Sequence, residues 1–298
     1  MIYYRDTKEI SLPSCSVTLG NFDGIHIGHQ LLVKAMKERI PDDCLKVMFS
    51  FDLDRFREKS LLTEEERRTK AERLGLDVFI LWPFDSATKN MLPEEFIRDI
   101  LKNQLHVNSI VVGDDFYFGR GRSGNVETLV HFSGKYDYEV VCIDKLKWKN
   151  EVVSSTRIRK DLEAGLMEDV SVLLGEEYRI EGQVIHGLHL GHSIGIPTIN
   201  VPVPGHKLTP PNGVYSSVTK IDGLMYPGVS NLGIKPSVTD NGVLGLETYL
   251  FDSDNDFYGK NVSVSLKSFL RPEQKFENLE ELKKQIHMDC ESAKQLLS

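Results

Sequence analysis

The first part of the chain alternates short, wholly apolar runs with longer segments of helical spacing. The segment 62–74 is predicted to be a helix, because Thr63 and Glu66 match a capping box at its start and Gly75 follows as a helix terminator. Strands that are apolar throughout lie buried on both faces, so this part predicts a parallel sheet covered by helices. The predicted strands are Val17–Leu19, Leu45–Phe51, Val78–Trp82, Ser109–Gly113 and Glu139–Ile143, and a further helix runs from Pro93 to about Leu101.

The pattern changes near Leu173–Tyr178. Beyond it, polar and apolar residues alternate in short runs separated by turn residues, which is typical of a small antiparallel β-barrel. A helical segment, Leu279–Leu297, closes the chain. We therefore predict two domains: an α/β domain over residues 1–176 and a β-barrel with a closing helix over 177–298. The predicted barrel strands are Tyr178–Ile185, Gly213–Thr219, Gly223–Val229, Leu246–Phe251 and Asn261–Phe269.

Composition narrows the class of protein. The chain has 298 residues and a formal net charge of −8, which argues against broad nucleic-acid binding because that needs a basic face. The four cysteines are scattered without a CxxC pair, which fits reduced thiols in a cytoplasm. No apolar run approaches the roughly 20 residues that span a bilayer, and the N-terminus has no apolar signal core. We expect a cytoplasmic protein with no membrane partner.

A glycine-rich turn, 20–24, joins the first predicted strand to a helix that the apolar spacing predicts at Gln30–Arg39. A strand, a glycine turn and a helix together aim backbone N–H groups at a phosphate. His26 and His29 stand at positions i and i+3, so they share one face at the helix start. Two imidazoles and a helix N-terminus suit adenylyl transfer from ATP, in which charge builds up on the α-phosphate. The alternatives are ordinary surface histidines, or half of a zinc site that has no cysteine pair nearby.

Two further segments of the first domain suit a phosphorylated, planar ligand. In the loop 111–124, Phe116 and Phe118 can stack on a ring and Arg120 or Arg122 can meet phosphate; the alternative is a solvated basic loop with core aromatics. In 153–159, Ser154 or Ser155 caps a helix and leaves N–H groups for an anion. Arg157 is the arginine that we expect to face the triphosphate, and the alternative is an ordinary capped surface helix.

The second domain contains its own candidate site. The segment 187–200 carries glycines that let the backbone approach a ligand, and Thr198 and Asn200 offer oxygen ligands for Mg²⁺. The chain has no G-x-x-x-x-G-K-[ST] motif, so this is not a P-loop. Glu247 lies midway along an alternating strand and is a candidate general base for a hydroxyl substrate. The alternatives are a glycine-rich hairpin loop and an outward-facing strand glutamate.

The motif Gly-Asn-Phe-Asp-Gly-Ile-His-Ile-Gly-His, residues 20–29, resembles the HxGH signature of the nucleotidyltransferase superfamily. In its longer form it resembles the bacterial bifunctional riboflavin kinase/FMN adenylyltransferase (FAD synthetase) family. The segments VVGDDFYFGRGRSG, SSTRIR, GxxxGxxxGxPTxN and FLRPEQKF are similar to that family's motifs and follow in its order over nearly the whole chain. The resemblance implies a Rossmann-like nucleotidyltransferase domain followed by a riboflavin kinase barrel. Its substrates would be riboflavin, FMN and ATP, with Mg²⁺ as cofactor.

The resemblance also implies roles for particular residues. Catalysis would depend on His26 and His29 in the transferase and on Glu247 in the kinase. The implied ATP site of the transferase is Gly20, Asn21, Phe22, Asp23, Gly24, His26, His29, Ser155, Thr156 and Arg157. Its implied flavin site is Asp115, Phe116, Phe118 and Arg122. In the kinase, the implied ATP site is Gly187, Gly191, Gly195, Pro197, Thr198 and Asn200, the flavin site is Asn231, Glu247 and Arg271, and the metal ligands are Thr198 and Asn200.

The chain departs from the family pattern at three places. Phe51-Asp52-Leu53 stands where the family usually carries Pro-His-Pro, His192 stands for an arginine in the kinase loop, and Lys235 and Ser237 replace an arginine and a threonine. Two alternatives therefore stay open beside the bifunctional enzyme. One is a riboflavin kinase with a weakened transferase, and the other is a non-catalytic flavin-binding regulator.

Overall fold

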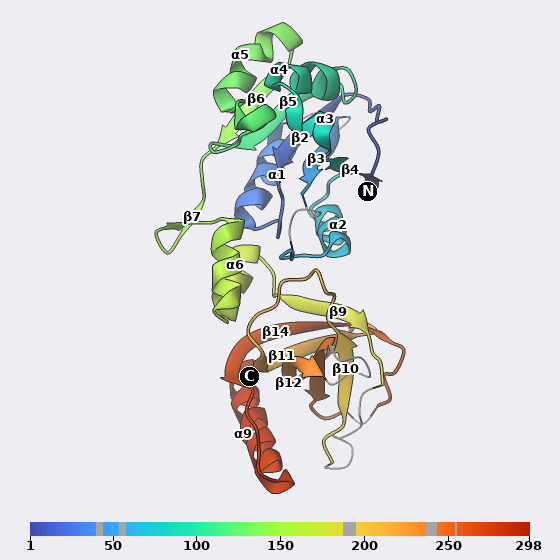
Figure 1. Cartoon of the computed structure of the whole chain (residues 1–298), viewed down its shortest axis with the longest axis vertical. Coiled ribbons are helices and arrows are strands. Elements are labelled where there is room, and N and C mark those ends of the chain that lie inside the picture. Colours follow the sequence, from blue (N-terminus) through green and yellow to red (C-terminus); the bar gives the residue numbers. More distant parts are fainter. Residues whose placement is uncertain (40–43, 54–57, 187–194, 236–242, 254) are drawn as a thin grey trace. The chain divides into compact units, whose positions relative to one another are not determined.

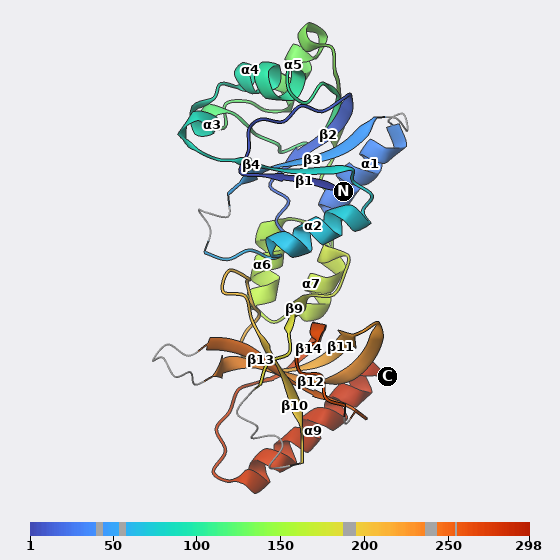
Figure 2. The ribbon, with the colours of Figure 1, turned by 90° about the vertical axis from the view of Figure 1, so that its right-hand side faces the viewer.

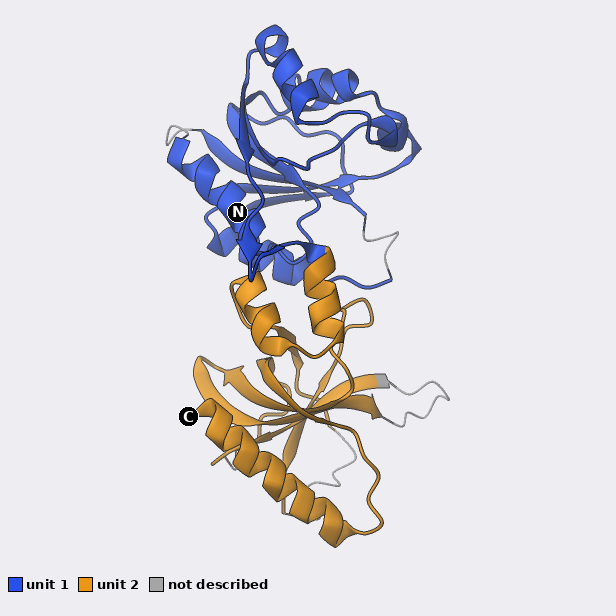
Figure 3. Ribbon diagram, turned by 90° about the vertical axis from the view of Figure 1, so that its left-hand side faces the viewer, with its two compact units in different colours: residues 1–155 blue, residues 156–298 orange. Residues whose placement is uncertain are grey.

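The computed structural model describes residues 1–39, 44–53, 58–186, 195–235, 243–253 and 255–298 (Figure 1). The chain divides into two compact units, Met1–Ser155 and Thr156–Ser298, which Figure 3 colours separately. This division falls upstream of the domain boundary that we expected at 176–177, and that boundary stays a prediction.

The first unit is built on a six-stranded sheet in the order β1-β4-β3-β2-β5-β6. Every neighbouring pair in it is parallel, as the apolar runs predicted. The sequence did not predict β1, because its four residues are Ile-Tyr-Tyr-Arg rather than an apolar run. The strands are β1 (Ile2–Arg5), β2 (Cys15–Gly20), β3 (Leu45–Asp52), β4 (Val78–Pro83), β5 (Val107–Gly113) and β6 (Glu139–Ile143).

Helices cover both faces of this sheet, with α1 (Ile27–Arg39) and α2 (Glu64–Arg73) on one side and α3 (Ser86–Asn90), α4 (Pro93–Glu95) and α5 (Val126–Tyr136) on the other (Figure 2). One buried cluster includes Leu32 and Met36 of α1, and a second includes Phe96 and Ile100. The capping box predicted at Thr63 is confirmed. The helix predicted from Pro93 begins there, but after one turn it continues as a π-helix, Phe96–Lys102.

The parallel strands bring the candidate residues of this unit to one edge of the sheet. The glycine turn follows β2, the aromatic loop follows β5, and residues 144–146 follow β6. Because the carboxyl ends of parallel strands meet at the same edge, these segments are neighbours although they lie far apart in the sequence. A short hairpin, β7 (Lys147–Trp148) and β8 (Glu151–Val152), then leads to Ser154 and Ser155.

The second unit begins with α6 (Ser155–Glu163, whose first residue belongs to the first unit) and α7 (Met167–Leu174). Its sheet has the order β10-β13-β12-β11-β14-β9 and is antiparallel throughout. A bridge between Ile185 and Asn200 brings the two ends of that order together, so the sheet closes into the predicted barrel. The strands are β9 (Arg179–Gln183), β10 (Thr198–Pro202), β11 (Gly213–Ile221), β12 (Leu224–Lys235), β13 (Val243–Leu250) and β14 (Asn261–Pro272).

The closing helix, α9 (Leu279–Leu297), lies along the outside of this sheet, as Figure 1 shows. Cys290 and Ala293 of the helix pack against Val214, Val229 and Phe251. Among the described residues, no helix is long and apolar enough to cross a membrane. The strand β10 was not predicted, because it starts inside the glycine-rich segment that we interpreted as a loop.

Candidate functional sites

The two histidines of the glycine turn are stacked on each other. Their ring centroids are 3.6 Å apart with an angle of 16° between the planes. The Nδ1 atom of His26 accepts the backbone N–H of His29 at 3.3 Å, so this imidazole caps the start of α1. A Cβ on Gly28 would lie 3.2 Å from the His26 ring, so glycine here leaves room for the ring to fold back. Because Nδ1 is an acceptor, the proton of the neutral ring is on Nε2.

The turn itself depends on an unusual backbone. Phe22, Gly24 and Ile25 have φ angles of 35°, 86° and 43°, in the region that glycine adopts readily and other residues rarely adopt. A Cβ on Gly20 would lie 2.9 Å from the ring of Phe22, so that ring requires a glycine. The carboxylate of Asp23 accepts the backbone N–H of Leu61 at 2.9 Å. These contacts fix the turn that aims the two imidazoles.

Both imidazoles are neutral at pH 7 in the free protein. Burial, followed by the nearby charge of Lys70, lowers the pKa of His26 from 6.5 to about 4. Burial also lowers the pKa of His29 well below 6.5, with smaller contributions from His26 and Lys70. Lys70 is buried in α2 and donates to the backbone carbonyl of Gly24 at 3.2 Å. A bound polyphosphate would oppose these effects, because an anion favours the protonated imidazole.

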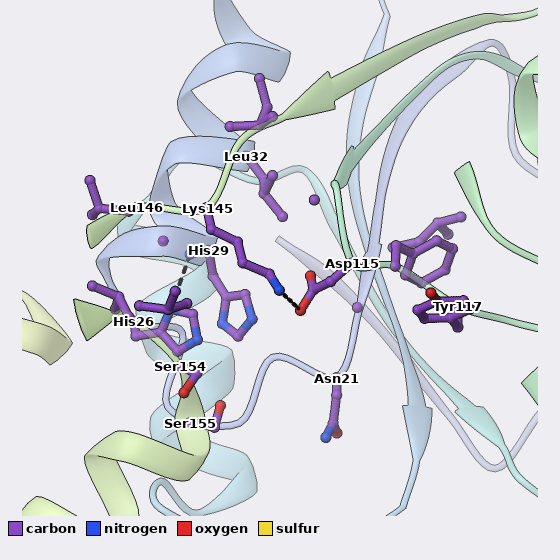
Figure 4. A pocket seen from close by; sticks show the side chains of 18 of the residues that line it. Asn21, His26, His29, Leu32, Asp115, Tyr117, Lys145, Leu146, Ser154 and Ser155 are labelled. Atoms are coloured by element: carbon purple, nitrogen blue, oxygen red, sulfur yellow. Dashed lines mark hydrogen bonds and ion pairs between the residues drawn. The ribbon is translucent and has the colours of Figure 1, made fainter. Parts of the chain in front are cut away.

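A cavity of about 470 Å³, here called the histidine pocket, opens at this edge of the sheet (Figure 4). Four predicted residues of the first unit do not line it, because they support the turn or the core: Phe22, Asp23, Gly24 and Phe118. Phe118 is buried and stacks on Phe116 with a centroid distance of 5.6 Å. The predicted residues that do line the cavity are Gly20, Asn21, His26, His29, Asp115, Phe116, Arg122 and Ser155.

The serine segment joins the glycine turn directly. The hydroxyl of Ser155 donates to the backbone carbonyl of Asp23 at 2.8 Å. Since α6 begins at Ser155, Ser154 takes the cap position. Thr156 and Arg157 fall in the second unit, where Arg157 pairs with Asp161 at 3.5 Å. Their contribution to the same triphosphate therefore stays a prediction.

The segment Phe51-Asp52-Leu53 places its two apolar residues on the pocket. Phe51 and Leu53 line the cavity, whereas Asp52 is buried and has Arg5 as a neighbour at 3.9 Å. The ring of Phe51 contacts those of Phe84 and Phe96 at about the distances of aromatic packing. This part of the wall is therefore apolar and aromatic.

In the second unit, the candidate residues form one row across five strands. Asn200 of β10 is opposite Glu247 of β13, and Glu247 is opposite Asn231 of β12. The row continues through Val214 of β11 to Arg271 of β14. Because side chains alternate along each strand, residues opposite one another project from the same face. Positions far apart in the sequence therefore meet on one patch of the barrel.

This row lines a second cavity of about 330 Å³, here called the glutamate pocket. Thr198, Leu282 and Ile286 also line it, the last two from α9. The amide oxygen of Asn231 is buried and has no hydrogen-bond partner within the described ranges, so it is available to a ligand. All five of the predicted kinase residues on strands lie in this pocket: Thr198, Asn200, Asn231, Glu247 and Arg271.

Arg271 is held in place by the closing helix. Its Nε and Nη2 atoms donate to the carboxylate of Asp289 at 2.9 and 2.8 Å. Gln285 donates to the same carboxylate at 2.9 Å. Asp289 is buried and lines the pocket. Sequence reasoning did not select Asp289, because a helical aspartate in a charged segment usually faces solvent.

A third cavity, here called the tyrosine pocket, adjoins the glutamate pocket at Thr198, which lines both. Pro197 and Tyr258 line it as well, and the ring of Tyr258 stacks on His186 at 3.8 Å. Gly195 has a φ of 77° and open space where a Cβ would stand. Gly187, Gly191, His192 and Ser237 lie outside the described residues.

Comparison with known proteins decides the family. A FAD synthetase family model matches residues 8–157, and a riboflavin kinase family model matches residues 174–297. A bifunctional riboflavin kinase/FMN adenylyltransferase of Pseudomonas fluorescens is 33% identical over 95% of this chain and 93% of its own. The enzyme of the same name from Buchnera aphidicola is 36% identical over 96% and 94%. The chain belongs to the bifunctional riboflavin kinase/FMN adenylyltransferase family.

The fold is similar to that of a solved structure over nearly the whole chain. A protein from Streptococcus pneumoniae, described as a macrolide-efflux protein, has a TM-score of 0.87 at 28% identity, over 97% of this chain and 96% of that chain. Its description and the names of the curated relatives differ. The family models match both halves of this chain in order, so membership of the enzyme family stands.

Among the residues of the histidine pocket, sequence reasoning missed Lys145. It follows β6, lines the cavity, and pairs with Asp115 across 3.1 Å. The hydrogen bond from Lys145 to Asp115 raises the pKa of Lys145 above 10.5. Lys145 belongs to no motif that we recognised, and only the adjacency of β5 and β6 brings it to Asp115. Lys145 could not be selected from the sequence because the order of the strands in the sheet was not known.

Proposed function

We propose that the two units carry out two successive reactions at separate sites. The glutamate pocket phosphorylates riboflavin to FMN, and the histidine pocket joins FMN to the AMP part of ATP to give FAD. The observation that carries the proposal is the row Asn200–Glu247–Asn231 in one cavity with Arg271. That row brings a carboxylate, two amides and a guanidinium to one ligand-sized space in a chain whose family performs this chemistry.

In the kinase, Glu247 accepts the proton of the ribityl 5′-hydroxyl as the hydroxyl oxygen attacks the γ-phosphorus of ATP. The bond from that phosphorus to the bridging oxygen breaks, and ADP leaves. Asn231 and Arg271 orient the flavin. The hydroxyl of Thr198 and the amide oxygen of Asn200 are hard oxygen donors on one strand face, which fits Mg²⁺. A bound Mg²⁺ supplies charge neutralisation for the phosphates.

We place the ATP of the kinase across Thr198, with its phosphates toward the glutamate pocket and its nucleoside in the tyrosine pocket. Thr198 lines both cavities, so one extended ligand can reach from one to the other. Tyr258 lines the tyrosine pocket, and its ring stacks on that of His186. A planar base suits such an aromatic wall.

In the transferase, a phosphate oxygen of FMN attacks the α-phosphorus of ATP and pyrophosphate leaves. The attacking phosphate is already ionised at neutral pH, so this step needs no general base. The Nε2–H of His26, the ring of His29 and the N-terminus of α1 stabilise the charge that develops on the α-phosphate. Phe116 and Arg122 hold the flavin end of the same cavity.

A kinase with a weakened transferase is the second candidate, and Phe51 and Leu53 favour it. They make part of the histidine pocket apolar where the family usually carries Pro-His-Pro. Incubation with FMN, ATP and Mg²⁺ decides between the two, because a functional transferase releases FAD and pyrophosphate in equal amounts. If supplied FMN stayed unchanged while riboflavin was still converted to FMN, the protein would be active only as a kinase.

Two substitutions test the residue assignment. Glu247→Gln should abolish FMN formation from riboflavin and spare FAD formation from supplied FMN, because the base is lost from one unit only. His29→Ala should abolish FAD formation from FMN and spare FMN formation from riboflavin.

The matched controls are Glu181→Gln, on the exposed face of β9, and His131→Ala, exposed in α5. Each control should leave both reactions unchanged. Normal kinase turnover in Glu247→Gln would refute the assignment of the base.

A further inference from the structure

The ion pair between Lys145 and Asp115 lies in the cavity where the transferase reaction is proposed to occur. Figure 4 shows the Lys145 side chain extended across the cavity, with its dashed contact to Asp115. In this view, His26 and His29 are on one side of the contact and Tyr117 is on the other. All five residues line the same space. The pair therefore stands between the predicted nucleotide end and the predicted flavin end.

The distribution of charge in the cavity makes Lys145 the candidate for contacting a phosphate. Both histidines are neutral in the free protein, because burial lowers the pKa of each ring. Among the lining residues, which all fall in the described ranges, the permanent cations are Lys145 and Arg122. The guanidinium of Arg122 lies over the ring of Tyr117 at 5.0 Å. Lys145 is thus the cation aimed at the middle of the cavity.

We propose that Lys145 binds the 5′-phosphate of FMN and that its contact with Asp115 holds the ammonium in place until the substrate arrives. This inference rests on the proposed function of the histidine pocket. Lys145 and Asp115 are 39% and 63% exposed at their side chains, so the pair is open to solvent and easily exchanged. The phosphate carries more negative charge than a carboxylate, so it displaces Asp115, which can turn outward.

The exchange predicts that this site distinguishes FMN from riboflavin. Riboflavin has no phosphate, so it leaves the Lys145–Asp115 pair intact across the cavity. FMN breaks the pair and brings its phosphate to the side of the histidines. The reaction then forms one bond, from this phosphate oxygen to the α-phosphorus of ATP, and breaks the bond from that phosphorus to the pyrophosphate. Lys145 takes part by holding charge and transfers no proton.

Steady-state kinetics of the full-length protein with FMN and ATP test the proposal. Lys145→Met should raise the KM for FMN about 10–100-fold, the loss expected for a hydrogen bond to a charged group. The KM for ATP should stay within about twofold, and Lys145→Arg should recover most of the loss. Riboflavin phosphorylation in the second unit should be unchanged, and the retained KM for ATP reports that the first unit has folded.

Swapping the two charged residues tests whether Lys145 binds the substrate or only forms a structural ion pair. The double variant Lys145→Asp with Asp115→Lys restores the pair but moves the cation to the other side of the cavity. The proposal expects the KM for FMN to stay raised, whereas a wild-type KM would overturn it. An unchanged KM for FMN in Lys145→Met, or a raised KM for ATP alone, would also overturn it. The site itself is tested separately by His29→Ala: unchanged FAD output there would refute the proposed function, whatever Lys145 does.

Discussion

Asp289 is the clearest case of one residue that positions another. Its carboxylate accepts charge-assisted hydrogen bonds from Nε and Nη2 of Arg271, and it is buried at the wall of the glutamate pocket. Asp289→Asn removes the charge and one of the two acceptors, so Arg271 loses its fixed direction. We expect the KM for riboflavin to rise about tenfold, corresponding to about 1.4 kcal/mol, with a smaller change in kcat.

The control for this variant is Glu291→Gln. Glu291 stands two residues further along the same helix, is exposed, and pairs with Lys294 at the surface. It should leave riboflavin kinetics unchanged. If Asp289→Asn also left the KM for riboflavin unchanged, Arg271 would not depend on the helix for its position.

At this scale, motifs selected the residues to which we assign the chemistry, but not the residues that support them. Glu247 could be selected because an alternating strand gives it a defined face, and its register with Asn200 then follows from pairing. Lys145 and Asp289 could not be selected, because each acquires its role from a partner on another element. Phe118 was predicted to contact the flavin, but it is buried against Phe96 and Phe116 and does not line the cavity. The sequence could not show this, because the burial depends on packing between separate elements.

At the scale of elements, the histidines at the start of α1 make the free energy of unfolding of the first unit depend on pH. His26 has a pKa of about 4 in the folded protein, whereas an unperturbed histidine side chain has a pKa of 6.5. The unfolded chain therefore binds more protons below pH 6.5, and stability falls as pH decreases from 6.5 toward 4. His26 alone should lower the free energy of unfolding by about 2 kcal/mol between pH 7 and pH 5. His29 acts in the same direction.

Urea unfolding followed by tryptophan fluorescence measures this effect. Both tryptophans, Trp82 and Trp148, lie in the first unit, so their emission reports that unit. The combined substitution of His26 and His29 by Gln should flatten the pH dependence, whereas His131→Gln, at an exposed position, should not. Equal stability of the wild type at pH 5 and pH 7 would contradict the buried, neutral histidine pair.

Hydrophobic periodicity predicted most elements because buried parallel strands and half-buried barrel strands have different patterns. The exceptions have physical reasons. The edge strand β1 is short and carries two tyrosines and an arginine, and β10 begins directly after Pro197 in a glycine-rich segment. The π-helix after Pro93 keeps an apolar face, so spacing alone cannot distinguish it from an α-helix.

For the whole molecule, each unit holds its own cavity with its own set of candidate catalytic residues. The cavity lined by Asn21, His26, His29 and Lys145 lies within the first unit, and the one lined by Asn200, Glu247 and Arg271 lies within the second. Within the described parts of the chain, no residue lines both cavities. A substitution that removes one reaction should therefore leave the other at its normal rate.

The most direct test supplies riboflavin, ATP and Mg²⁺ to a mixture of two inactive variants and separates the flavins by chromatography over time. Glu247→Gln alone should leave riboflavin unchanged, and His29→Ala alone should stop at FMN. Mixed together, they should produce FAD, because FMN made by one protein is used by the other. Absence of FAD from the mixture, although His29→Ala alone forms FMN and Glu247→Gln alone converts supplied FMN, would contradict two independent sites joined by free FMN.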